Sequence, residues 1–175
     1  MNNRHLSIFI GLAALSFLLL FTDPSQAISP MTHDPQGFKG IKWGTALHTL
    51  NHLTLVDPDD RIQEYQFKED SLQFADTKVE TLRLLTIDGK FARVMIRYHG
   101  ENTHQTIIKY LSAQYGKIQR QRGSMVRGLN QENTWRGNDT EINLNYRGHG
   151  EQGFILIQSR ILAPKFMEMV SEHSH

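Results

Sequence analysis

The sequence predicts an α+β fold, in which two helix-plus-antiparallel-sheet units form one sheet with both helices on the same face. Apolar and polar residues alternate on both sides of Asp88-Gly89, a dipeptide that favours a tight β-hairpin turn. Apolar residues recur at helical spacing after Asn102. The chain also aligns with itself at an offset of 60 residues, which indicates an internal duplication. The aligned pairs are Leu47 with Ile107, Leu82 with Ile142, Leu84 with Leu144, Val94 with Phe154 and Ile96 with Leu156.

Residues 1–27 are typical of a secretory signal peptide. Arg4 and His5 precede an apolar run that extends from Leu6 to Phe21, and the segment ends on Ser25-Gln26-Ala27, so cleavage is expected after Ala27. The apolar run has about 16 residues, short of the roughly 20 that a membrane-spanning helix needs. We therefore expect a periplasmic or secreted protein with no integral membrane segment after cleavage.

The composition excludes several classes of protein. None of the 175 residues is cysteine, which excludes thiol catalysis, disulfides and thiolate zinc sites. The formal net charge is +1 and basic and acidic residues are interspersed, so nothing drives electrostatic binding to nucleic acid. The length after cleavage suits a single domain.

The predicted domain covers residues 37–163, in two units of about 37–100 and 101–163. Residues 28–36 contain two prolines and no periodic pattern, and are expected to be a flexible lead-in. Thr45 is a candidate cap for a first helix over residues 45–53. Residues 57–60, Asp-Pro-Asp-Asp, are expected to end regular secondary structure, and an edge strand is expected from Ile62 to Phe67.

The later elements have clearer patterns. A hairpin is predicted from Val79 to Tyr98, and a second helix runs from Asn102 to a stop at Gly116. Three more strands are expected, at residues 134–136, 141–147 and 154–162. Residues 164–175 are expected to form a C-terminal tail or a short helix.

Residues 37–47, with the sequence GFKGIKWGTAL, carry a resemblance to a known group. The segment resembles the GF-x-GI-x-WGT-x-L opening of uncharacterised secreted bacterial proteins. The two-unit layout is similar to the tandem fold of the secreted β-lactamase-inhibitor protein and, per unit, to small outer-membrane assembly lipoproteins. Those relatives bind proteins, so the resemblance implies a binding or assembly role. The chain lacks the lipidation cysteine of the lipoprotein group.

Two sets of residues are candidates for partner binding. Trp43 and Trp135 are aromatic anchors of the kind found at protein interfaces. A polar segment carries three arginines whose guanidinium groups could hold a phosphate or carboxylate. These are Arg120, Arg122 and Arg127.

A metal-handling protein is the alternative. His48 and His52 stand four residues apart on the first predicted helix, a spacing that lets two imidazoles reach one Zn or Cu ion. The C-terminal segment carries a set of soft and imidazole ligands suited to Cu(I). These are Met167, Met169, His173 and His175.

An enzyme is not expected, although a small hydrolase remains a third hypothesis. Residues 148–153 match G-x-G-x-x-G, but a predicted strand follows where a dinucleotide site needs a helix. No catalytic residue and no cofactor are therefore assigned. The sequence favours an exported, non-enzymatic binding or protein-interaction domain of the cell envelope. Its partner would be an envelope or secreted protein that meets the open sheet face or the two tryptophans.

Overall fold

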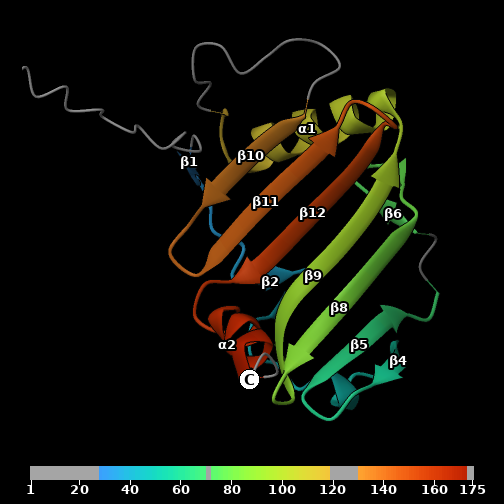
Figure 1. Ribbon diagram of the computed structural model, residues 1–175, viewed down its shortest axis with the longest axis vertical. Coiled ribbons are helices and arrows are strands. Elements are labelled where there is room, and N and C mark those ends of the chain that lie inside the picture. The colour runs from blue at the N-terminus through green and yellow to red at the C-terminus, as the bar shows by residue number, and fades with distance from the viewer. Residues whose placement is uncertain (1–27, 70–71, 119–129, 173–175) are drawn as a thin grey trace, which may run out of the picture.

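A computed structural model of the chain describes residues 28–69, 72–118 and 130–172, and has a mixed α+β fold built on one eight-stranded sheet (Figure 1). The strand order is β1-β10-β11-β12-β9-β8-β5-β4, and every neighbouring pair is antiparallel except β1 and β10. In chain order these strands are β1 (Ile28–Pro30), β4 (Leu53–Pro58), β5 (Ile62–Phe67), β8 (Thr81–Ile87), β9 (Lys90–His99), β10 (Gln131–Arg136), β11 (Thr140–Arg147) and β12 (Gln152–Ser159). Two small hairpins lie outside the sheet, β2 (Gly37–Phe38) with β3 (Ile41–Lys42), and β6 (Gln73–Phe74) with β7 (Thr77–Lys78).

The main core lies on one face of this sheet, which we call the inner face. Helix α1 (Glu101–Tyr115) covers it with Ile107 and Leu111, which are four residues apart and fully buried. Each such side chain contributes about 1.5–3 kcal/mol by leaving water. The sheet residues of the main core include Leu82, Leu84, Val94, Ile96, Ile142, Leu144, Ile155 and Ile157.

Helix α2 (Pro164–Glu172) packs on the opposite face, which we call the outer face. The guanidinium of Arg93 lies 4.1 Å from the centre of the Phe166 ring, and Arg93 alternates along β9 with the core residue Val94. The two helices lie at opposite ends of the sheet (Figure 1). A small second cluster, which we call the α2 cluster, joins α2 to the sheet; its buried members are Leu85, Ile87, Ala92, Ala163 and Phe166.

The prediction of a helix over residues 45–53 is wrong. This segment forms a 3₁₀ turn at Leu47–Thr49, and strand β4 then begins at Leu53. The backbone of Gly44 and Thr45 is hydrogen-bonded to Phe91 of β9, at 2.8 and 2.9 Å, and Thr45 therefore ties the segment to the sheet. Leu47 is buried as a single anchor, and no amphipathic helix forms around it.

The predicted hairpin and the second helix are confirmed, but the duplication is not. The offset of 60 residues pairs Val94, which faces the main core, with Phe154, which faces outward. Leu84 pairs with Val94 in the first hairpin, and Leu144 pairs with Ile155 in the second. The structural counterpart of Val94 is therefore Ile155, at an offset of 61 residues. A β-bulge between Leu85 and Thr86 marks the irregular position in the first hairpin. With no helix at 45–53 and α2 on the outer face, the expected arrangement of both helices on one face is not found.

The prediction that residues 28–36 form a flexible lead-in is also wrong. Residues 28–30 form β1, which pairs in parallel with β10 at the sheet edge. The carboxylate of Asp34 accepts hydrogen bonds from the backbone N–H groups of Gln36, Asp139 and Thr140, at 3.0, 2.6 and 3.2 Å. Burial opposes ionisation, but the hydrogen bonds from Thr140, Asp139 and Gln36 outweigh it and hold the pKa of Asp34 below its ordinary value.

The motif of residues 37–47 has a structural role in this chain. Lys39 and Gly40 both have positive φ, at 47° and 80°, as a two-residue hairpin turn of type I′ requires. Gly37 has no room for a side chain, because a Cβ there would meet the carbonyl of Ile41. The motif therefore builds the β2–β3 hairpin.

Replacement of Asp34 tests the clasp between the N-terminal segment and the β10–β11 turn. We expect Asp34→Ala to lower the free energy of unfolding by about 1–3 kcal/mol, because it leaves partly buried N–H groups without an acceptor. Urea denaturation followed by circular dichroism measures this. Asp57→Ala on the exposed edge strand β4 is the control and should change stability by less than about 0.5 kcal/mol. Equal losses in the two variants would contradict the role of Asp34.

A groove on the outer sheet face as the candidate binding site

Four strands of the sheet place their outward side chains in rows across the outer face. In one row Arg97 of β9 lies opposite Phe154 of β12, and Phe154 lies opposite Asn145 of β11. Asn145 in turn lies opposite Glu132 of β10. In the next row Gln152 lies between its partners on β9 and β11, His99 and Arg147. Each of the four strands therefore contributes outward side chains to this surface.

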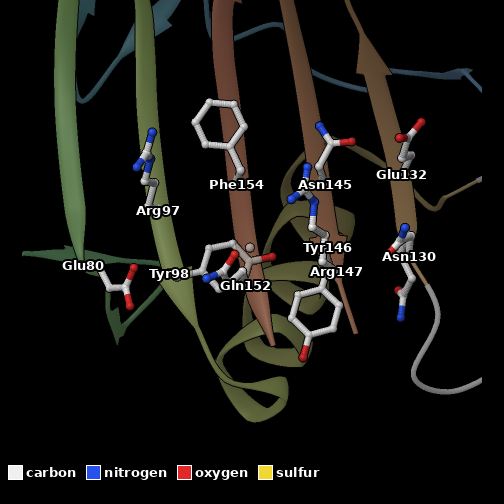
Figure 2. A pocket seen from close by; sticks show the side chains of 12 residues that line it. Glu80, Arg97, Tyr98, Asn130, Glu132, Asn145, Tyr146, Arg147, Gln152 and Phe154 are labelled. Atoms are coloured by element: carbon white, nitrogen blue, oxygen red, sulfur yellow. The ribbon is translucent and has the colours of Figure 1, made fainter. Parts of the chain in front are cut away.

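These rows line an open groove with a volume of about 590 Å³ (Figure 2). Its walls combine amides, charges of both signs and one large apolar side chain. The lining residues are Glu80, Arg97, Tyr98, Asn130, Gln131, Glu132, Asn145, Tyr146, Arg147, Gln152, Gly153 and Phe154. Such a mixture can donate and accept hydrogen bonds around one apolar contact.

The two basic residues of the groove lie near its centre, and two acidic residues lie at its sides. Figure 2 shows Arg97 and Arg147 on either side of β12, the strand that carries Phe154. Glu80 and Glu132 lie further out, at the two sides of the groove. Within the part of the chain that the structure describes, neither arginine makes an ion pair or a side-chain hydrogen bond. Two guanidinium groups are therefore available to a ligand.

Phe154 and Leu156 form an apolar pair on the central strand β12. Both are half-buried, and within the described residues neither belongs to the main core or to the α2 cluster. Leu156 lies opposite Met95, which packs at the margin of the α2 cluster. An apolar surface thus continues from the α2 cluster into the open part of the outer face.

A buried polar chain lies beneath the groove on the inner face. The ring of His104 is fully buried in α1, and its Nε2–H donates to Gln131 Oε1 at 3.1 Å, because a carbonyl oxygen can only accept. In the neutral ring Nδ1 must then accept, so the Tyr98 hydroxyl donates to it at 2.7 Å. The Tyr146 ring stacks on His104, with ring centres 3.9 Å apart. Gln131, Tyr98 and Tyr146 also line the groove, so this chain supports its floor.

Burial lowers the pKa of His104 below its ordinary value of 6.5, although the hydrogen bond to Gln131 and the charge of Glu101 act in the opposite direction. Burial likewise raises the pKa of Tyr98. Both groups are therefore neutral at pH 7, and the hydrogen-bonded chain is complete in that state.

Neither tryptophan stands free for a partner. Trp135 is fully buried and its Nε1–H donates to the carbonyl of Gly116 at 2.8 Å, so its expected role in partner binding is wrong. Trp43 is half-buried, lies 4.8 Å from the Phe91 ring and donates to Thr140 Oγ1 at 2.9 Å. Both indoles serve packing, and their N–H groups are satisfied inside the protein.

The structure does not bring together those residues of the predicted metal sites that it describes. His48 and His52 are exposed, and the helix that would align them does not form. His52 instead stacks on Phe67. Met167 is 70 % exposed on α2. Among the described residues no group of three or more His, Asp or Glu side chains could hold a metal ion. The predicted residues that lie outside this part of the chain are Arg120, Arg122, Arg127, His173, His175 and the side chain of Met169.

The groove residues carried a weak signal in the sequence. Residues 154–157 are apolar without a break, whereas a strand with one solvated face should alternate. This continuous run places apolar side chains on both faces of β12. Arg97 fitted the polar half of the β9 alternation, and nothing in the sequence distinguished it from an ordinary surface arginine.

Comparisons with known proteins do not identify the chain. No protein-family model, curated protein or solved structure matches it. Among the described residues, no helix has the length and apolar character needed to cross a membrane.

His104 makes the stability of the protein depend on pH. The unfolded chain takes up a proton near pH 6.5 and the folded protein only at lower pH, so the free energy of unfolding falls as the pH drops below about 6.5. Urea unfolding at several pH values between about 7.5 and 5 measures this slope.

His104→Gln retains a hydrogen-bonding side chain that does not titrate, and should flatten the slope between pH 6.5 and the lower pKa of the folded state. His99→Gln, at the exposed end of β9, is the control and should keep the slope. An unchanged slope in His104→Gln would show that the buried ring does not control the pH dependence.

Proposed function

We propose that the protein is an exported, non-enzymatic binding domain of the cell envelope, which holds a protein partner on its outer sheet face. The observation that supports this most strongly is the pair Phe154 and Leu156, which lie on the central strand outside both core clusters. Covering apolar side chains in the middle of a sheet face with another surface removes them from water and is therefore favourable.

The composition of the groove fits a protein interface. The centres of such interfaces are enriched in aromatic residues, methionine and arginine, and their rims are polar. Here Phe154 lies on β12 between the strands that carry Arg97 and Arg147, and Leu156 and Met95 lie one row further along β12 and β9. Glu80 and Glu132 lie further out. A specific interface buries roughly 1,200–2,000 Å² in total, so a partner would extend beyond the groove over the neighbouring strands.

The outer face is a better docking surface than the sheet edges. The edge strand β1 has only three residues, and the other edge, β4, contains a register shift and ends at Pro58. Bulges and proline at an edge discourage the addition of another strand. The backbone of β12 is already paired on both sides. Recognition would therefore depend on side chains of the face.

The cellular location in this proposal rests on residues 1–27, which are typical of a cleaved signal peptide. An envelope or secreted protein is accordingly the expected partner. The hypothesis of two duplicated helix-plus-sheet units stands apart from this proposal, because the groove uses β9, β10, β11 and β12 together.

A photo-crosslinking amino acid at position 156 tests the docking surface. In intact cells that produce the protein naturally, the probe at Leu156 should give one dominant cross-linked protein. Phe154→Ser in the same chain should reduce this product at least about tenfold, because it removes the adjacent apolar contact. Mass spectrometry identifies the product, and gel quantification measures its yield.

The matched control places the same probe at Ala113, an exposed position of α1 on the other side of the sheet. This position should give no such product. Cross-linking of the same protein from both positions, or no product from position 156, would contradict docking on the outer face.

A further inference from the structure

We infer that the protein partner presents carboxylates on both sides of an apolar side chain, which would bind Arg97 and Arg147 on the two sides of Phe154. This inference rests on the proposed docking surface and specifies the chemistry of its partner. It is carried by the positions of Arg97 and Arg147 on the outer face, and not by the apolar pair alone.

The arginines of the outer face fall into two groups. Arg93 lies over the Phe166 ring and donates to Gln158, and Arg83 lies 3.9 Å from Glu64. Those two side chains are engaged within the protein. Arg97 and Arg147 line the groove and, within the described residues, make no ion pair or side-chain hydrogen bond. They are the two cations of the groove that a partner can neutralise.

The positions of these two arginines set the spacing of the partner's acidic groups. They lie on β9 and β11, separated by β12, and their rows are two residues apart along the strands. Strands are about 4.8 Å apart and rise about 3.4 Å per residue, so the two backbones are roughly 12 Å apart. An extended segment covers that distance in about three to four residues. Two carboxylates about four residues apart, with an apolar residue midway between them, fit this span.

The charges of the groove favour a discrete acidic segment over a uniformly anionic surface. Glu80 lies outside Arg97, so a sheet of negative charge would meet repulsion on that side. Anionic membranes are bound by clusters of about four to eight basic residues. The groove has two, and the whole chain has a formal charge of +1. Guanidinium also pairs with a single carboxylate through two parallel hydrogen bonds, and this geometry favours individual carboxylates of a partner.

Synthetic peptides test this inference on the purified protein without residues 1–27. The probe is an extended peptide with a central phenylalanine and a glutamate two residues away on each side. The matched peptides carry glutamine or lysine at the same two places. Fluorescence anisotropy measures binding at two or more salt concentrations. We expect the glutamate peptide to bind at least about tenfold more tightly than the glutamine peptide, and the lysine peptide to bind least. The difference should shrink as salt increases.

The double variant Arg97→Gln and Arg147→Gln should remove the preference for the glutamate peptide. The control, Lys90→Gln with Lys109→Gln, makes the same change in net charge at exposed positions outside the groove, and should keep the preference. Circular dichroism of both variants confirms that they fold.

Three results would overturn the inference. The glutamate peptide binds no better than the glutamine peptide, or no peptide binds at about millimolar concentration, or vesicles rich in phosphatidylglycerol bind through the same arginines and compete with the glutamate peptide. Each leaves the cross-link from position 156 as a separate test, so failure of the acidic partner is distinguishable from failure of the docking surface.

Discussion

The pairing of β12 with β9 and β11 is the constraint on which the rest of the structure depends. It joins the hairpin β8–β9 to β10 and β11, and so makes one sheet from two halves of the chain. Gly153 lies opposite Tyr98 in this register, and the Tyr98 ring occupies the space that a side chain at position 153 would need. An aromatic ring laid across a glycine on the next strand is a recurrent device that fixes strand register. A slip by one residue would place a side chain under the ring and expose the core face of β12.

The same register builds both faces of the molecule. On the inner face it brings Tyr98 and Tyr146 to His104, which closes a buried hydrogen-bonded chain with Gln131. On the outer face it aligns Arg97, Phe154 and the polar side chains of β10 and β11 into the groove. The groove is therefore rigid because its floor is the paired backbone of a sheet whose other side is the protein core. A rigid surface loses little conformational entropy when it binds.

Sequence patterns predicted the elements with strong periodicity. The Asp88-Gly89 turn, the helix after Asn102 and the β11 strand were all found where expected. The helix at 45–53 failed because three leucines at helical spacing also suit a buried anchor, Leu47, followed by an edge strand that starts at Leu53. Hydrogen bonds between Phe91 and the backbone of Gly44 and Thr45 favour the second arrangement over the helix. Local sequence patterns do not reveal such long-range bonds. The same limit explains Trp135, whose indole looked like an interface anchor and is instead held by Gly116.

The groove itself could be predicted only in part. The unbroken apolar run at 154–157 indicates two apolar faces. That no element among the described residues covers Phe154 is known only once the sheet order is known. The sequence also does not show which arginines are engaged within the protein, because Arg93 and Arg97 occupy equivalent places in the β9 alternation. Helix α2 covers the first and leaves the second open.

Hydroxyl-radical footprinting in intact cells tests most directly whether a partner covers the outer face. The measurement compares the oxidation of Phe154 and Met95 in cells that produce the protein naturally with their oxidation in the purified protein. Met167, exposed on α2, is the internal reference. If the outer face is the docking surface, Phe154 and Met95 should be protected several-fold in cells while Met167 reacts equally in both samples. Equal oxidation of Phe154 in cells and in the purified protein would contradict the account.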